Sequence, residues 1–314
     1  MEESFRDFKR IVKNTLKTMK YIHRKEGYLY TFLLLDIIWC YLRYGITYNE
    51  YRIFKFYDLE GSKRKTYISK RNYKKLRKIL IDEEITNVLK DKMMFLRRFE
   101  SFIDRDIYNI NYISFKDFEE FAYKNRFLLA RSANSKFISS YKEFDVDKYR
   151  SPAFTLEDIK EKKLYLIEKK ITQHKRLNEI APFTVINVVS VINRNNIDLV
   201  TASIKYKEGN KLISGNINVR QGIITGRFKD ENGHNYGQDF DGFIVPYFEE
   251  IKESCALLAR EIEEIRQVEW SFVVGARGII YLVDANIWDD YVFSQIPEFL
   301  NNRIGLMSYY KKII

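Results

Sequence analysis

The N-terminal hundred residues alternate hydrophobic and polar positions with the period of an α-helix. Hydrophobic residues recur three or four positions apart in residues 4–25, at Phe5, Phe8, Ile11, Val12, Leu16, Met19 and Ile22. This spacing predicts a helix that Gly27 ends. The more continuous apolar stretch of residues 28–44 predicts a second, largely buried helix that ends at Gly45. Shorter helices are predicted over residues 71–80, 82–89 and 91–103.

The pattern changes after about residue 110. Ser114 precedes an amphipathic segment and predicts a capped helix that extends to residue 123. Short apolar runs at residues 127–130 and 163–168 have the length of strands. Further strands are predicted over residues 185–192, 199–206, 212–219, 222–228, 268–274 and 278–283, with an amphipathic helix over residues 251–265.

Together these elements predict an α+β protein: a helical N-terminal region followed by two α+β subdomains with mainly antiparallel sheets. We expect boundaries that give a basic helical region at residues 1–90, a first subdomain at 91–170 and a second at 171–314. The chain has 314 residues and 46% hydrophobic residues, which suits several packed subdomains and excludes a disordered chain.

The positive charge is confined to the N-terminal part of the chain. Residues 1–100 contain 24 Lys/Arg and 13 Asp/Glu, whereas residues 101–314 contain 30 of each. A basic region of this kind attracts phosphates, an anionic membrane surface or nucleic acid, and it also fits a solvated helical face. We expect peripheral membrane contact ahead of nucleic-acid binding, which interleaved tyrosines alone support weakly.

Neither a disulfide framework nor a membrane span is expected. Cys40 and Cys255 lie in apolar segments without metal-site spacing, which predicts two buried free thiols. The most apolar run, residues 30–42, is shorter than the about 20 residues that a span requires. With no secretory signal in the sequence, we expect a cytoplasmic protein.

Three short segments carry residue types suited to nucleotide chemistry. Asp284 and Asn286, two apart on a predicted strand, can present oxygens to one Mg²⁺, although Asp-x-Asn is also common in turns and caps. Lys92, at a predicted helix start, can hold a phosphate. The strand that ends at Glu168 and bends towards Ile171 can offer backbone groups to a planar base, or is a surface strand end.

The order of such segments resembles the sugar-transfer associated ATP-grasp family. The matching stretches run through most of the chain. They are Asp36 with residues 43–45, the aromatic residues Tyr51, Phe54, Phe56 and Tyr57, residues 64–69, residues 91–95, Ile167 and Glu168 with Ile171, Gln173 and His174, and residues 283–286. The resemblance implies an ATP-grasp fold that holds ATP between two α+β subdomains.

The resemblance also implies site roles and a reaction. Lys92 and Arg131 would contact ATP phosphates, Glu168 and Ile171 would frame the nucleoside, and Asp284 with Asn286 would bind Mg²⁺. The implied activity is an ATP-dependent carboxylate–amine ligase that forms an acyl phosphate, acting on a small-molecule or sugar-linked substrate in surface-polysaccharide or sugar modification.

Several positions depart from the pattern of that family. Arg131 replaces a lysine, and the following loop, residues 132–136, has no glycine. Ser190 stands where an arginine is expected and Ser271 where a metal carboxylate is expected. Glu269 is the nearest carboxylate, and a one-residue shift of the alignment would turn it to the opposite strand face. The alternative function is therefore a catalytically degenerate ATP-grasp binding protein, and whether the chain is an enzyme stays open.

Overall fold

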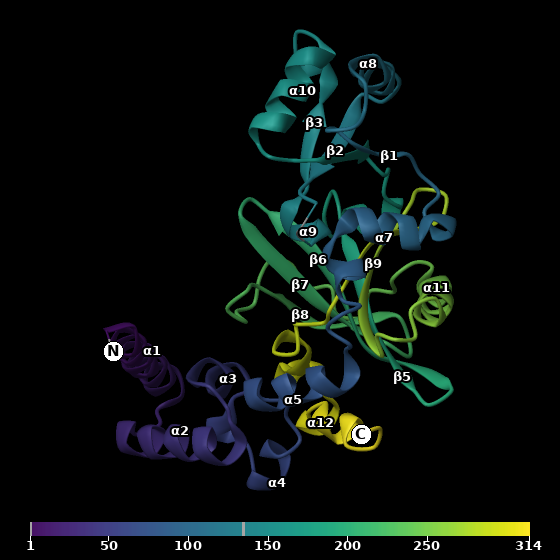
Figure 1. Cartoon of the computed structure of the whole chain (residues 1–314). Coiled ribbons are helices and arrows are strands. Elements are labelled where there is room, and N and C mark those ends of the chain that lie inside the picture. Colours follow the sequence, from purple (N-terminus) through teal and green to yellow (C-terminus); the bar gives the residue numbers. More distant parts are fainter. Residues whose placement is uncertain (1, 134–135) are drawn as a thin grey trace. The chain divides into compact units, whose positions relative to one another are not determined.

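The computed structural model describes residues 2–133 and 136–314, and it divides the chain into two units (Figure 1). Unit 1 comprises residues 1–80 and 289–314, and unit 2 comprises residues 81–288. This grouping differs from the boundaries expected at residues 90 and 170, because the C-terminal segment packs with the N-terminal helices rather than with the second sheet.

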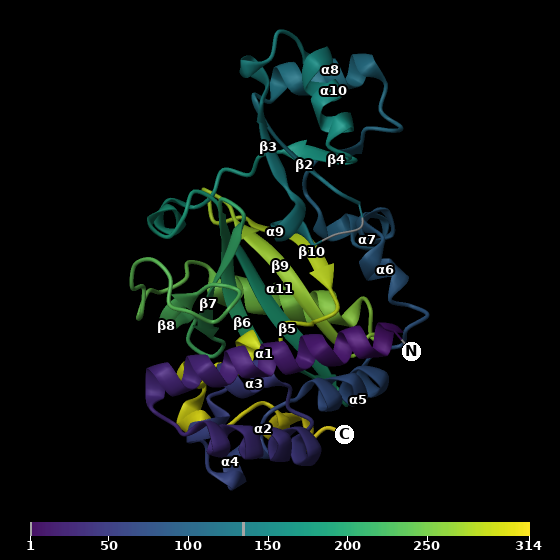
Figure 2. The same ribbon diagram turned by 90° about the vertical axis from the view of Figure 1, so that its left-hand side faces the viewer.

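Unit 1 is helical, as expected. Its helices are α1 (Glu2–Glu26), α2 (Tyr30–Tyr44), α3 (Tyr48–Ile53), α4 (Gly61–Arg64), α5 (Lys70–Leu80) and α12 (Met307–Tyr310), with 3₁₀ helices at Phe56–Asp58, Phe293–Gln295, Pro297–Phe299 and Asn301–Arg303. α1 and α2 follow one another across Gly27 and are drawn in purple in Figure 2. Gly45 ends α2 with φ of 72°, and its N–H donates to the Tyr41 carbonyl.

The sequence-based prediction that α2 is largely buried is wrong. Leu33, Ile37 and Cys40 face the core of unit 1, but the remaining large apolar side chains of α2 are exposed, including Leu35 at 69% and Trp39 at 57%. The helix is apolar on nearly every side, whereas only one side has elements packed against it. The hydrophobic pattern therefore identified the helix and not its surroundings.

Unit 2 contains two antiparallel sheets. Its strands are β1 (Ile107–Asn109), β2 (Phe127–Arg131), β3 (Lys142–Asp145), β4 (Leu166–Lys169), β5 (Val185–Asn193), β6 (Asn196–Glu208), β7 (Lys211–Asn218), β8 (Ile223–Lys229), β9 (Gln267–Val274) and β10 (Ile280–Asn286). The four-stranded sheet has the order β1-β4-β2-β3, and the six-stranded sheet has the order β10-β9-β5-β6-β7-β8. The predicted α+β class with mainly antiparallel sheets is confirmed.

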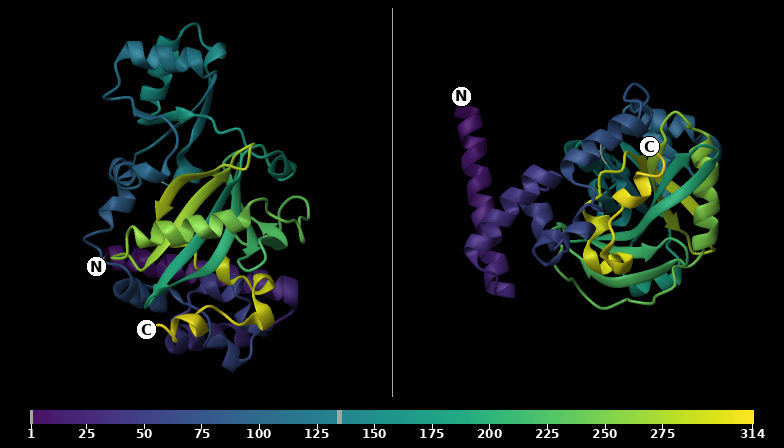
Figure 3. Two further views of the ribbon diagram at one scale, coloured as in Figure 1. Left: turned by 90° about the vertical axis from the view of Figure 1, so that its right-hand side faces the viewer. Right: turned by 90° about the horizontal axis from the view of Figure 1, so that it is seen from below.

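Unit 2 also contains helices. They are α6 (Asn87–Lys90), α7 (Lys92–Arg98), α8 (Phe115–Lys124), α9 (Phe137–Ser140), α10 (Pro152–Glu161) and α11 (Phe248–Arg260), with 3₁₀ helices at Glu100–Phe102, Val146–Lys148 and Lys175–Glu179. α8 and α10 pack through Phe118 and Ile159 on the four-stranded sheet. α11 lies against β5, β6 and β9, as the left-hand view of Figure 3 shows. The predicted cap of α8 is confirmed, because the Ser114 hydroxyl accepts from the Asp117 N–H.

The face of the six-stranded sheet opposite α11 carries a row of polar side chains. Adjacent strands pair so that six polar side chains form one row across it, which we call the polar row: Asp284, Ser271, Asn187, Ser203, Asn216 and Thr225. Side chains alternate along a strand, so the residues between these positions point towards α11 and are mostly apolar. A row of polar side chains is unusual on a buried sheet face, and the candidate site includes its first member, Asp284.

Candidate functional site

Arg131 is buried, and it has no hydrogen-bond partner among the residues that the structure describes. It ends β2 on the same sheet face as Glu168 of β4, since Arg131 pairs with Leu166 and Leu129 pairs with Glu168. Its side chain is 2% exposed, and residues 2–133 and 136–314 provide no hydrogen-bond acceptor for any of its three guanidinium nitrogens. Nε lies 3.7 Å from Glu168 Oε1, and Nη1 lies 3.9 Å from Asp284 Oδ1. Burial lowers the pKa of Arg131, although both carboxylates oppose that effect.

Lys92 is buried as deeply as Arg131 but has a full set of acceptors. It begins α7, whose N-cap is Asp91. Its Nζ lies 2.7 Å from Asp284 Oδ1 and donates to Asn286 Oδ1 at 3.1 Å. It also faces the carbonyl oxygens of Leu89 at 2.7 Å and Ala285 at 3.1 Å. The three protons of the Lys92 ammonium therefore have four protein oxygens as acceptors, so no proton remains for a ligand. Burial lowers the pKa of Lys92, and Asp284 opposes that effect.

Arg105 belongs to the same cluster, although sequence analysis did not select it. It precedes β1, and its Nε forms an ion pair with Glu168 Oε2. Its Nη1 donates to the Leu282 carbonyl at 2.7 Å, which joins the two sheets. Glu168, 1% exposed, thus serves two arginines. Nothing in the local sequence distinguishes Arg105 from the other basic residues, and only the pairing of β1 with β4 brings it to Glu168.

Glu269 lies on the same face as the predicted metal ligands. Asn286 pairs with Glu269 and Asp284 pairs with Ser271, so the one-residue shift that would turn Glu269 to the opposite face does not occur. The Glu269 carboxylate lies 3.1 Å from Lys136 Nζ and 3.5 Å from Lys205 Nζ, and it accepts from Asn187 Nδ2 at 3.1 Å. Burial alone would raise the pKa of Glu269, but the two ammonium groups outweigh it and lower the pKa to about 2.

We expect the low pKa of Glu269 to make the stability of the folded protein depend on pH in the acid range. The folded pKa lies below the ordinary value of 4.5, so the stabilisation is complete above pH 4.5 and is lost as the pH falls towards 2. Calorimetric unfolding between pH 6 and pH 3 should show a shallower loss of melting temperature in Glu269→Gln than in the wild type. Glu161→Gln, at an exposed position, should retain the wild-type slope. Equal slopes in wild type and Glu269→Gln would contradict the assignment.

The cluster as a whole carries excess positive charge. It contains Lys92, Arg105, Arg131, Lys136 and Lys205 against Glu168, Glu269 and Asp284, which leaves two positive charges in excess. Apart from Lys136, each of these side chains is nearly inaccessible to solvent. Burying unbalanced charge is costly, so such a cluster is suited to an anionic ligand.

The residues present do not fit a divalent cation in this arrangement. Asp284 and Asn286 share a face, as predicted, but the Lys92 ammonium lies between their oxygens. Asp284 Oδ2 also accepts from the Phe137 N–H at 2.8 Å and from Asn286 Nδ2 at 2.9 Å. Across residues 2–133 and 136–314, no group of three or more His, Cys, Asp or Glu side chains could hold a metal ion. The Lys92 ammonium therefore contacts both oxygens that were predicted to bind Mg²⁺.

The remaining predicted positions have structural partners. Ile171 is buried in the core between the sheets with Leu129 and Val283. The buried Gln173 side chain accepts from the Thr184 N–H at 2.5 Å. Ser190 accepts from Trp270 Nε1 at 2.8 Å and points to the α11 side of the sheet, away from Asn187. Of the glycine-free loop, residues 134 and 135 lie outside the described residues.

Two further observations concern the whole chain. Cys40 and Cys255 are buried free thiols, as predicted, and burial raises the pKa of each. Among the described residues, no helix combines the length and the apolar character needed to cross a membrane.

Comparison with known proteins found similarity at the level of structure alone. No family model and no curated protein matches this chain. Similar solved structures include the ADP complex of purK, an N5-carboxyaminoimidazole ribonucleotide synthetase, with a TM-score of 0.41 and 11% identity over 63% of this chain and 44% of that chain. The L-amino acid ligase from Bacillus licheniformis gives a TM-score of 0.43 and 9% identity over 70% of this chain and 46% of that chain.

A third similar structure is the ATP-grasp ligase PsnB complexed with minimal precursor, Mg and ADP. Its TM-score is 0.45 and its identity 10%, over 74% of this chain and 61% of that chain. The chain thus spans less than two thirds of the length of each of these three proteins.

Proposed function

We propose that this chain is an ATP-binding protein of the ATP-grasp type and that it acts as an ATP-dependent carboxylate–amine ligase. The observation that carries the proposal is the buried Arg131 guanidinium, whose nitrogens have no hydrogen-bond acceptors. Each buried donor that lacks an acceptor destabilises the folded protein by about 1–3 kcal/mol, and by more when the donor is charged. A phosphate group would offer the planar pair of acceptors that a guanidinium matches best.

The charge of the cluster supports the same ligand. Glu168 and Asp284 lie too far from Arg131 for hydrogen bonds, because Glu168 Oε1 is 3.7 Å from Nε and Asp284 Oδ1 is 3.9 Å from Nη1, while Arg105 and Lys92 lie closer to the two carboxylates. The two positive charges in excess would be offset by the phosphates of a nucleotide. In this proposal Arg131 binds phosphate, and Glu168 keeps Arg131 and Arg105 in position. The roles predicted for Glu168 and Ile171 towards the nucleoside remain part of the proposal.

The proposed reaction has two balanced steps. A carboxylate oxygen of the substrate attacks the γ-phosphorus of ATP, and the bond from that phosphorus to ADP breaks, which gives an acyl phosphate. An amine then attacks the carbonyl carbon, phosphate leaves with the C–O bond electrons, and the amine loses a proton. In this proposal Asn187 of the polar row, whose buried Oδ1 has no hydrogen-bond partner among the described residues, accepts a hydrogen bond from a small-molecule or sugar-linked substrate. A role in surface-polysaccharide or sugar modification, in the cytoplasm, rests on the sequence motifs.

A second candidate is a protein that binds a nucleotide without turnover. The observation in its favour is Lys92, whose ammonium occupies the space between Asp284 and Asn286. Ser271 opposite Asp284 also removes the carboxylate expected there. With an internal cation already in place, nucleotide binding would not depend on Mg²⁺. The catalytic role predicted for Lys92 belongs to the first candidate and not to the second.

One experiment separates these candidates. We expect ATP to raise the melting temperature of the full chain, because a ligand that binds only the folded state stabilises it by mass action. The titration is made with Mg²⁺ and with EDTA, and ADP release is followed with amino-acid and amino-sugar acceptors. ADP release on addition of an acceptor supports the ligase. Stabilisation that is equal with EDTA, and without ADP release, supports the non-catalytic candidate. No stabilisation by ATP in either buffer would overturn both.

A further inference from the structure

The outer side of α2 is an apolar surface that no element of the described part of the chain covers. We call it the α2 apolar face, and it consists of Leu34, Leu35, Ile38, Trp39, Tyr41 and Leu42. Each of these residues is at least 43% exposed, and at 100° per residue they span about half of the helix circumference. Contiguous apolar surface of this extent is uncommon on soluble proteins and indicates a binding surface.

No charge interrupts the α2 apolar face. Asp36 points to the inner side of the helix, where it pairs with Arg64 Nη1 at 2.6 Å and accepts from the Tyr51 hydroxyl at 2.7 Å. Arg43 lies at the C-terminal end of α2. The helix has 15 residues, which is too short to cross a bilayer, so any lipid contact would leave it in the plane of the interface.

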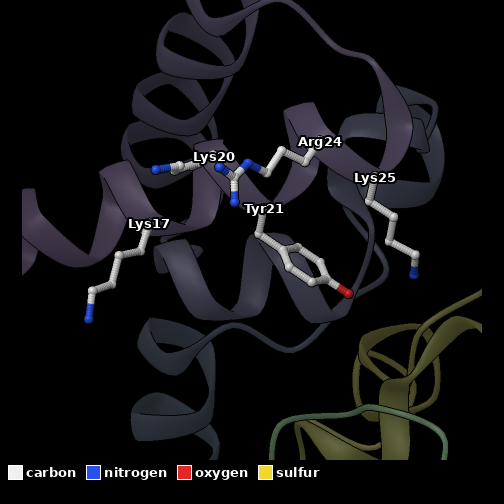
Figure 4. Close-up of a pocket in the computed structure, with 5 residues that line it drawn as sticks. All are labelled: Lys17, Lys20, Tyr21, Arg24 and Lys25. Carbon is white, nitrogen blue, oxygen red and sulfur yellow. The ribbon is translucent and has the colours of Figure 1, made fainter.

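The neighbouring helix α1 is strongly basic. Lys17, Lys20, Tyr21, Arg24 and Lys25 line a surface depression of about 410 Å³ along it, and the lysine and arginine side chains spread around the tyrosine ring (Figure 4). The exposed Leu16 lies one turn from Lys13 and Lys20, so apolar and basic positions adjoin on this helix too. Residues 1–80 contain 20 Lys/Arg and 8 Asp/Glu, an excess of 12 positive charges.

Charge identifies the occupant of this surface. A second copy of the chain would bring two strongly positive units together, which opposes self-association. An anionic bilayer offers both a hydrocarbon edge for leucine and isoleucine and phosphates for lysine and arginine. Trp39 and Tyr41 are residue types that favour the interface between headgroups and acyl chains. We propose that unit 1 docks on an anionic membrane, with the α2 apolar face inserted at the interface and α1 contacting lipid phosphates.

The test uses the full chain and sedimented vesicles. Vesicles of phosphatidylcholine with 30% phosphatidylglycerol, a composition chosen as the anionic probe, should bind the protein far more strongly than phosphatidylcholine alone. Leu35→Glu with Trp39→Glu should weaken binding at least about 30-fold, since it places charges in the apolar contact. Lys17→Glu with Lys20→Glu and Arg24→Glu should weaken it about 100-fold. All of these side chains are exposed, so the melting temperature should stay unchanged.

Matched controls come from exposed positions of unit 2. Leu257→Glu and the pair Lys116→Glu with Lys124→Glu make the same chemical changes elsewhere and should leave vesicle binding unchanged. Trp39 supplies a direct readout, because Trp270 and Trp288, the other tryptophans, are buried. Brominated phosphatidylglycerol vesicles should quench Trp39 fluorescence and shift it to shorter wavelength.

Three outcomes would overturn the proposal. The first is vesicle binding that the α2 variant leaves unchanged. The second is a Trp39 shift that depends on protein concentration in the absence of vesicles, which would indicate that a second copy covers the α2 apolar face. The third is equal binding to neutral and anionic vesicles, which would remove the role of α1. The nucleotide site plays no part in this test, so its failure and that of the proposed function are distinguishable.

Discussion

Replacing Lys92 by methionine lowers the free energy of unfolding by about 3–5 kcal/mol, which is the usual cost of leaving a buried charge without its partner. Asp284, fully buried, would lose the ammonium at 2.7 Å and keep the Phe137 N–H, the Asn286 amide and, as its remaining cation, the more distant Arg131 guanidinium at 3.9 Å. Urea denaturation of the full chain measures this change. Lys90→Met, at an exposed position in the preceding turn, should change the free energy of unfolding by less than about 0.5 kcal/mol.

The double variant distinguishes a lost ion pair from a lost side chain. Adding Asp284→Asn to Lys92→Met removes the unpaired charge, so it should recover much of the stability. If Lys92→Met instead unfolds with the wild-type free energy, the ammonium is not a structural cation and the phosphate role predicted for Lys92 gains support.

Replacing Arg131 by methionine should weaken ATP binding rather than lower the free energy of unfolding, in contrast to Lys92→Met. Arg131→Met should leave the free energy of unfolding unchanged or raise it, because a buried guanidinium without acceptors destabilises the folded state. In Arg131→Met, Glu168 still forms its ion pair with Arg105 and Asp284 still forms its ion pair with Lys92, so neither carboxylate is left without a cation. ATP affinity, measured by calorimetry, should fall about 100-fold, as for the loss of two charge-assisted hydrogen bonds.

Arg126→Met is the matched control for Arg131. Arg126 is an exposed arginine immediately before β2 that pairs with Asp145 and Asp147, and its replacement should leave ATP affinity unchanged. A loss of stability in Arg131→Met comparable to that of Lys92→Met, with unchanged ATP affinity, would overturn the assignment of Arg131 to a ligand and with it the main support for the proposed function.

Much of the secondary structure followed from local pattern. α1 (Glu2–Glu26), α8 (Phe115–Lys124) and β5 (Val185–Asn193) agree closely with the predicted ranges, since each has a clear hydrophobic period and a capping or turn residue at its end. β1 and β3 were missed because strands of three or four residues give no measurable alternation. The helix predicted over residues 82–89 begins only at α6 (Asn87–Lys90) and is preceded by a turn at residues 83–86, which shows how weakly a short mixed segment specifies its own structure.

The sequence by itself determined the α+β class, the helical character of residues 1–80 and the residue types that could meet a nucleotide. These properties depend on periodicity, charge and short motifs, which are local. Only the tertiary structure separated Lys92 from Arg131: the two cations look equivalent in the sequence, but one is enclosed by four oxygens and the other has no acceptor. It likewise decided that α2 presents its apolar side to solvent, because burial depends on which elements pack against a helix and not on the helix alone.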